Sequence, residues 1–197
     1  MTAINNYAFY GNKTITEIII PDSVTAIEQS AFRNCVNLET VYISSSVEKI
    51  SSYAFADCTN LKNVTFAENS KLTVLEGYVF YNCVGLKTIV IPDALKQING
   101  YAFYCCSSLE SIVIPDSVEK INSYAFAYCT NLSSVVIGSG MKNIYSYVFY
   151  SCPKLTTVII RSESIAQNIT SSSSNGYLVY YADTVLVSED ISNVGDY

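Results

Sequence analysis

The sequence predicts a single solenoid, in which short coils of about 23 residues stack on one another through parallel β-strands. Three observations support this prediction. Phenylalanine recurs at a nearly constant interval, a short β-branched segment recurs in the same frame, and half of the 197 residues are hydrophobic although no apolar run exceeds six residues. One such coil cannot bury its own apolar edges, whereas stacked coils can.

The repeat is marked by phenylalanines that are 23 residues apart, with one interval of 25. They are Phe9, Phe32, Phe55, Phe80, Phe103, Phe126 and Phe149. The surrounding stretch, such as Tyr101-Ala-Phe-Tyr104, is too short to form a stable helix alone. We therefore expect a helical or 3₁₀ turn that places each phenylalanine in the core. The longer interval carries two extra residues near 67–71, where we expect the turn to bulge.

A strand is predicted six residues after each phenylalanine, where blocks such as Leu109-Glu-Ser-Ile-Val-Ile114 begin. Alternation and β-branching are typical of a short strand. Pro-Asp-Ser at 115–117 supplies turn chemistry directly after it, and two further apolar positions follow, here Val118 and Ile121. The sequence thus predicts one continuous parallel sheet and little regular α-helix.

These residues resemble the BspA-type leucine-rich repeats of bacterial and protist surface proteins. The family repeat reads roughly L-x-x-I-x-I-P-x-S-V-x-x-I-x-x-x-A-F-x-x-C, and the segment from Leu109 to Cys129 matches every defined position. The resemblance implies a right-handed leucine-rich-repeat solenoid, located extracellularly or at the cell surface and involved in adhesion and host interaction. It implies no catalytic residues.

The chain divides into two predicted parts. Residues 1–160 form seven phenylalanine-marked turns of one solenoid, and residues 161–197 form a degenerate repeat plus a partial final repeat that acts as a C-terminal cap. The segment 177–181 is apolar enough to cover the last coil. Because the chain starts and stops inside a repeat, we expect a fragment of a longer protein, with natural ends and a frayed coil as the alternative. Open ends would favour end-to-end self-contact.

The charge balance argues against several partners. Lys and Arg number 11 and Asp and Glu number 17, which gives a net charge of −6 and no basic stripe for nucleic acid. Histidine is absent, so the commonest general base and metal ligand is missing. We expect no enzyme activity, no cofactor, no metal and no insertion of this segment into a membrane.

Cysteine recurs in one slot of the repeat, three residues after phenylalanine. We expect these thiols to be reduced and buried, with a polar atom that reaches a neighbouring backbone carbonyl. They are Cys35, Cys58, Cys83, Cys106, Cys129 and Cys152. Cys105 occupies a different slot that is predicted to be exposed, which makes it either a candidate reactive thiol or a chance surface cysteine.

Two surfaces are candidates for binding. The middle residues of the strands should point outward and form a candidate binding face: Ile19, Tyr42, Thr65, Val90, Val113, Val136 and Ile159. The alternative is ordinary β-propensity on an exposed sheet. A candidate aromatic stripe precedes the phenylalanines by two residues: Tyr53, Tyr78, Tyr101, Tyr124 and Tyr147. These tyrosines form either an aromatic platform or a half-buried layer with hydroxyls in water.

The sequence and the resemblance together predict a non-enzymatic, extracellular protein-interaction module. The candidate role is that of an adhesin, which binds a host or matrix protein, or a glycan, through the repeat sheet face. The alternative is a passive spacer or surface-coat segment of a larger protein.

Overall fold

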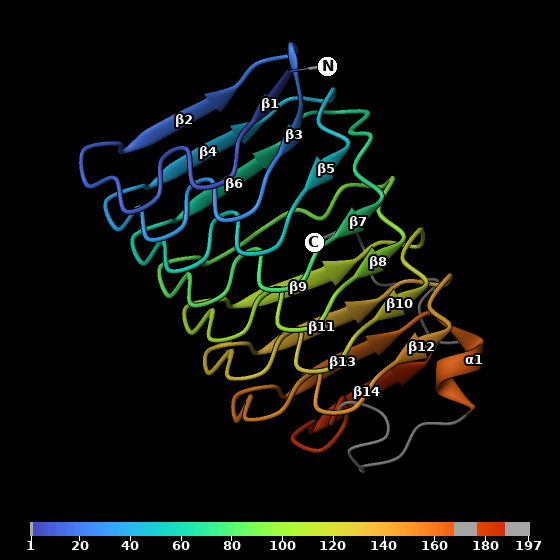
Figure 1. Ribbon diagram of the computed structural model, residues 1–197. Coiled ribbons are helices and arrows are strands. Elements are labelled where there is room, and N and C mark those ends of the chain that lie inside the picture. The colour runs from blue at the N-terminus through green and yellow to red at the C-terminus, as the bar shows by residue number, and fades with distance from the viewer. Residues whose placement is uncertain (1, 168–176, 188–197) are drawn as a thin grey trace.

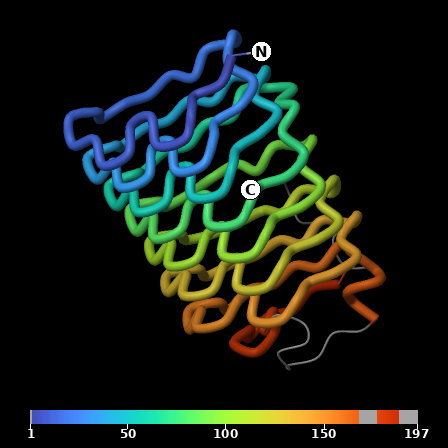
Figure 2. Tube along the Cα trace, in the orientation of Figure 1, coloured from blue at the N-terminus to red at the C-terminus, as the bar shows by residue number. Residues whose placement is uncertain are grey.

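The computed structural model describes residues 2–167 and 177–187, and it confirms the predicted solenoid. Coils of similar outline stack along one axis, from the blue N-terminal end to the red C-terminal end (Figure 1, Figure 2). All paired strands are parallel. In the described ranges the only helix is α1, Glu163–Ala166. The stacking follows from the constant repeat, since each coil places the same residue types beside those of the next.

The predicted strands form the first face of the solenoid, which we call the strand face. Its strands are β2 (Glu17–Ile20), β4 (Thr40–Ile43), β6 (Asn63–Phe66), β9 (Ser111–Ile114), β11 (Ser134–Ile137), β13 (Thr157–Ile160) and β14 (Thr184–Val187). They are in register, so that Ile19 lies beside Tyr42 and Val113 beside Val136. Inward residues of these strands are buried and outward ones are more exposed, as the alternation predicts.

The prediction of one continuous sheet was wrong. Residues 88–91, in the fourth coil, are not a strand, so the strand face consists of the sheets β2-β4-β6 and β14-β13-β11-β9. The two extra residues near 67–71 lengthen the turn that follows β6. That turn and residues 90–94 line a cavity of about 490 Å³ between the two coils. Residues 88–91 form no backbone hydrogen bond with β6 or with β9.

A second sheet forms on the side of each coil that follows the strand face along the chain. It has the order β1-β3-β5-β7-β8-β10-β12. Its strands are β1 (Thr2–Ile4), β3 (Val24–Ile27), β5 (Lys49–Ile50), β7 (Val74–Leu75), β8 (Gln97–Ile98), β10 (Lys120–Ile121) and β12 (Asn143–Ile144). Five of these strands have only two residues. Such strands are too short to show an alternating pattern, which is why the sequence predicted only apolar positions there.

The phenylalanine stretches form stacked β-turns rather than the expected 3₁₀ or helical turns. Two residues per stretch have a positive φ, for example Tyr101 at 61° and Cys105 at 60°, and a helix cannot continue through such residues. The backbone N–H groups alternate between two partners. Tyr104 N–H donates to Tyr101 within the turn, and Phe103 N–H donates to Ala125 of the next coil at 2.8 Å. Pairing between coils therefore replaces the hydrogen bonds of a helix.

The core is a column of phenylalanine rings. Consecutive rings are stacked with centroids 5.0–5.6 Å apart, and the six from Phe32 to Phe149 are fully buried. Phe9, in the first coil, is exposed and stacks on Phe32 alone. Removal of one such buried ring typically costs about 3–5 kcal/mol. The column ties each coil to both neighbours.

The C-terminal segment packs on the last coil where the structure describes it. β14 pairs with β13 in register, which places Val185 beside Val158 as the returning repeat pattern predicts. Leu178 is fully buried in the hydrophobic core, and the ring of Tyr177 lies 5.7 Å from that of Tyr147. Residues 168–176 and 188–197 lie outside the described residues, so the division at 160 and the role of 161–197 as a cap stay predictions.

One coil substitutes Gly138-Ser-Gly140 for the Pro-Asp-Ser turn, and packing explains this change. The sequence Gly138–Gly140 stacks on residues 115–117 of the preceding coil. A Cβ at Gly140 would lie 2.0 Å from the backbone oxygen of Asp116, and a Cβ at Gly138 would lie 2.5 Å from a backbone carbon of Pro115. Ser139 N–H donates to the Asp116 carboxylate at 2.7 Å in the same contact. The two coils approach too closely here for any side chain at the glycines.

We predict that Gly140→Ala destabilises the protein by roughly 1–3 kcal/mol, because the new methyl group clashes with a backbone carbonyl that cannot move freely. Thermal unfolding measures the effect. Gly11→Asn is the control: Gly11 has a φ of 68°, a Cβ there would make only an ordinary contact with Asn34 Nδ2 at 3.9 Å, and Asn34 itself holds the same slot one coil later. Equal melting temperatures for Gly140→Ala and the wild type would contradict this account of the close approach.

We predict that deletion of residues 162–197 lowers the melting temperature strongly or causes aggregation, because it exposes the edge of β13 and removes Leu178 from the core. Thermal unfolding and size-exclusion chromatography measure both effects. Deletion of 188–197 alone is the control, since it keeps β14 and Leu178. A monomeric and equally stable protein lacking 162–197 would show that the segment is a linker and not a cap.

Candidate functional site

The strand face carries the predicted outward residues, and their exposure is uneven. Val90, Ile19 and Val113 are 82%, 68% and 52% exposed. Tyr42 and Thr65 are also exposed, whereas Val136 and Ile159 are half-buried. The structure brings these residues together in two groups, because the interruption at residues 88–91 separates Ile19, Tyr42 and Thr65 from Val113, Val136 and Ile159. Val90 lies between the groups, on a segment that is paired with neither sheet, and it lines one hollow together with Val113.

The segment around Val90 has unpaired backbone groups. Within the described ranges, none of the N–H or C=O groups of residues 88–91 forms a backbone hydrogen bond. The 490 Å³ cavity lies on its β6 side, and a second hollow of about 360 Å³, lined by residues 88–91, Asp93, Ser111, Val113 and Pro115, lies toward β9. The sequence analysis missed this site. The only sequence feature that pointed to it was the interval of 25 residues.

The aromatic stripe is a stack of tyrosine rings. From Tyr53 to Tyr147 consecutive ring centroids are 4.5–5.0 Å apart and the planes are nearly parallel. Neighbouring rings therefore cover each other's faces and leave mainly edges and hydroxyl groups for a ligand. An aromatic platform can bind a sugar by stacking it face-on against a ring. Between neighbouring tyrosines of this stripe no ring face is open to such a contact. All five tyrosines are half-buried.

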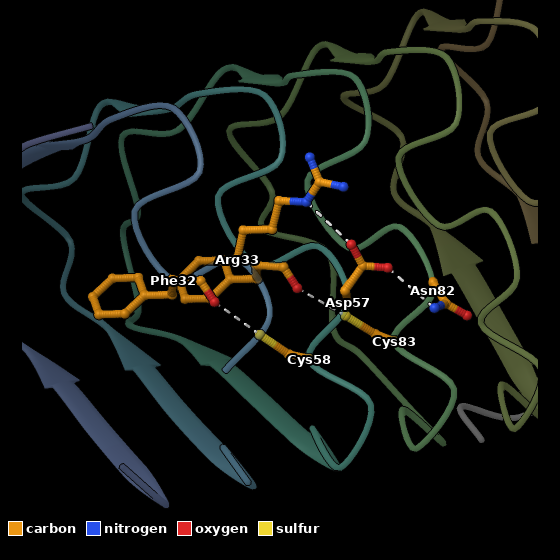
Figure 3. A network of polar contacts seen from close by, with 7 residues as sticks. Phe32, Arg33, Asp57, Cys58, Asn82 and Cys83 are labelled. Carbon is orange, nitrogen blue, oxygen red and sulfur yellow. Dashed lines mark hydrogen bonds and ion pairs between the residues drawn. The ribbon is translucent and has the colours of Figure 1, made fainter. Parts of the chain in front are cut away.

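The six cysteines of the repeat slot are fully buried and free, as predicted. Each thiol donates to the carbonyl of a phenylalanine in the preceding coil, at sulfur–oxygen distances of 3.1–3.3 Å, as Figure 3 shows for Cys58 and Phe32. Burial raises the pKa of the Cys83, Cys106 and Cys129 thiols, and it raises the pKa of Cys152 to about 12. These four thiols are therefore protonated donors at neutral pH and unreactive.

Cys105 is half-buried, and thus less exposed than its slot predicts. Its N–H donates to Ala127 of the next coil at 2.9 Å, which draws the turn inward against its neighbour. Partial burial raises the pKa of the Cys105 thiol above its ordinary value. Since the thiolate is the reactive form, this shift lowers the reactivity of Cys105 at neutral pH.

No metal-binding cluster is found in the part of the chain that the structure describes. Within residues 2–167 and 177–187, no three Cys, Asp or Glu side chains gather as a metal ion would require. In the same ranges no helix has the length and the hydropathy to cross a membrane.

We predict that a maleimide labels Cys105 of the native protein and leaves the other six thiols unmodified, because only Cys105 is partly exposed. The rate of Cys105 labelling should keep rising as the pH passes the ordinary thiol pKa. The reason is that the pKa of Cys105 is raised, so most of this thiol is still protonated at that pH. Mass spectrometry counts the labels, and denatured protein, in which all seven should react, is the control. Rapid labelling of all seven cysteines in the native protein would show that the six cysteines of the repeat slot are not buried.

Comparisons with known proteins agree with this architecture. The sequence profile described as BspA type Leucine rich repeat region (6 copies) matches residues 1–104 and 69–177. No curated protein matches the chain at a significant level.

Three solved structures resemble the chain. A leucine-rich repeat protein of T. pallidum (TpLRR) is 33% identical, with a TM-score of 0.70 over 73% of this chain and 69% of that one. A leucine-rich repeat protein from Bacteroides ovatus is 26% identical, with a TM-score of 0.47 over 82% and 59%. A leucine rich cell surface protein from Faecalibacterium prausnitzii is 19% identical, with a TM-score of 0.33 over 100% and 87%. The profile match over most of the chain and the likeness to TpLRR show that this chain belongs to the BspA-type leucine-rich repeat family.

Proposed function

We propose that the chain is a non-enzymatic protein-interaction module that binds a host or matrix protein through the interrupted strand face. The observation that carries the proposal is the exposed Val90 beside backbone groups that have no hydrogen-bond partner. Contiguous exposed apolar surface tends to mark interaction sites. Unpaired strand edges bind extended peptides by adding a strand, with main-chain hydrogen bonds for affinity and side-chain pockets for specificity.

The geometry of the strand face suits such a partner. β6 and β9 each have one edge without a paired strand, and the two hollows lie between these edges and residues 88–91. An extended segment of a partner protein could satisfy backbone donors and acceptors there. Its alternate side chains would contact Val90, Phe66 and Val113, which line the hollows.

The proposed location is the cell surface or the extracellular space, with adhesion as the role. This part of the proposal is supported by membership of the family, whose resemblance implies surface proteins, and by the absence of a basic stripe in a chain of net charge −6. The competing function is a passive spacer. The continuous phenylalanine column favours it, because that column holds the coils together without any contribution from the outer surface.

We predict that Val90→Asp and Val113→Asp each weaken binding to a matrix protein at least tenfold, because a carboxylate in the hollow loses its water on binding. Saturable binding of the purified chain to a panel of immobilised matrix proteins measures the effect. Thr73→Asp is the matched control, since Thr73 is an exposed β-branched residue next to β7 on the second sheet.

Melting temperatures should stay unchanged in these variants, because both valines are exposed. Saturable binding that survives both valine substitutions would place the site elsewhere. If no protein of the panel binds the wild type saturably, the spacer function is favoured.

A further inference from the structure

A pocket in the aromatic stripe differs in chemistry from the strand face. It has a volume of about 420 Å³, within the roughly 300–1,000 Å³ of small-molecule sites. Its lining consists of one arginine and five tyrosines from neighbouring coils: Arg33, Tyr53, Tyr78, Tyr81, Tyr101 and Tyr104. Arg33 is one of only two arginines in the chain.

The row of side chains that follows the phenylalanines is interrupted in one coil near this pocket. The slot directly after phenylalanine holds Tyr81 and Tyr104 in two of these coils and Arg33 in an earlier one. Between Arg33 and Tyr81 the same slot holds Ala56, which has only a methyl group. The row of large side chains is therefore interrupted at Ala56, which is itself fully buried, and the pocket lies beside the stacked rings of Tyr53 and Tyr78, whose centroids are 4.5 Å apart.

The guanidinium of Arg33 is held in place by one edge only. Its Nε–H donates to Asp57 Oδ2 at 3.1 Å, and Asn82 donates to the other carboxylate oxygen at 3.1 Å, which fixes Asp57 in turn. The guanidinium carbon lies 5.0 Å from the centre of the Tyr53 ring. Figure 3 shows the two terminal nitrogens of Arg33 directed away from Asp57. Among the described residues these nitrogens have no hydrogen-bond partner.

A fixed arginine with free terminal nitrogens is suited to a carboxylate. The planar guanidinium forms two parallel hydrogen bonds with a carboxylate, and its orientation is already set here by Asp57 and Tyr53. The negative charge of Asp57 offsets much of the positive charge of Arg33. A simple anion would therefore gain little from charge alone, and a ligand that binds here needs further contacts.

The tyrosines of the pocket supply hydroxyl groups as hydrogen-bond partners for a ligand. Burial raises the pKa of Tyr78, Tyr81 and Tyr104, so their hydroxyls keep their protons at neutral pH and can both donate and accept hydrogen bonds. The Tyr81 and Tyr104 rings are stacked at 5.3 Å, which repeats the phenol groups at short intervals. An apolar ligand body would leave these hydroxyls unpaired, whereas a body that carries several hydroxyls of its own would satisfy them.

We infer that this pocket binds an acidic sugar, a ring that bears a carboxylate and several hydroxyl groups. The carboxylate contacts the terminal nitrogens of Arg33, and the sugar hydroxyls exchange hydrogen bonds with the tyrosine hydroxyls. This site goes beyond the proposed protein-binding function, because it lies in the aromatic stripe, uses other residues and takes a ligand of another class.

Isothermal titration of the full chain with glucuronic acid, galacturonic acid and N-acetylneuraminic acid tests the inference. Glucose is the matched sugar without a carboxylate, and acetate is the carboxylate without a sugar ring. We expect at least one acidic sugar to bind at least tenfold more tightly than glucose and acetate. Failure of all three acidic sugars to bind would overturn the inference, as would glucose or acetate of equal affinity. A short aspartate-containing peptide that matches the sugars would assign the pocket to protein carboxylates instead.

Variants locate the binding. Arg33→Gln should weaken it at least tenfold, and so should Arg33→Lys, because a lysine keeps the charge but lacks the planar pair of donors. Arg161→Gln is the control, since Arg161 is exposed and lies outside the pocket.

Undiminished sugar binding in both Arg33 variants would overturn the inference. Melting temperatures of the Arg33 variants should change little, because the ion pair with Asp57 is partly exposed. The two functions are separable: Val90→Asp should leave sugar binding intact, and Arg33→Gln should leave binding to matrix proteins intact.

Discussion

The register between consecutive coils is the constraint on which the rest of the structure depends. It is set by backbone hydrogen bonds from each phenylalanine to the residue that precedes the next phenylalanine, at 2.7–3.0 Å. The same register of one repeat recurs in all three sheets, so a residue type that recurs in the sequence recurs as a contact in space. The columns of phenylalanine, cysteine and tyrosine are consequences of this one relation. Even the free thiols follow it, because each buried cysteine donates to a phenylalanine carbonyl in the coil before it.

A regular stack of this kind offers few binding sites by itself. Where the same residue type recurs in a slot, the side chains contact groups of the neighbouring coil. Tyrosine rings stack on tyrosine rings, and thiols donate hydrogen bonds to backbone carbonyls. Both candidate sites lie where the repeat changes. The strand face is interrupted at residues 88–91, in the coil that follows the interval of 25 residues, and the pocket of the aromatic stripe contains Arg33, which no other coil has in that slot. Function in such a protein is therefore to be sought at the irregular coils.

Much of the architecture could be predicted because a repeat turns local pattern into tertiary contact. The spacing from Phe32 to Phe149 predicted the stacked core, the alternation at Ser111–Ile114 predicted a strand, and the shared slot of Cys58 and Cys83 predicted buried thiols beside backbone carbonyls. Each of these three predictions requires only that similar coils stack in register. The outward placement of Ile19 and Val113 follows in the same way from the period of two.

The sequence by itself therefore determined the stacking, the core and the direction of most side chains, whereas the tertiary structure decided the exceptions. The interruption at residues 88–91 lies in the coil that follows the two extra residues, and the interval alone does not reveal that strand pairing is lost there on both sides. The positive φ of Tyr101 and Cys105 depends on hydrogen bonds to the next coil, which outweigh the local preference for a helical turn. The free end of Arg33 depends on Asp57 and Asn82, which lie 24 and 49 residues away in the sequence and meet the arginine only because their coils stack.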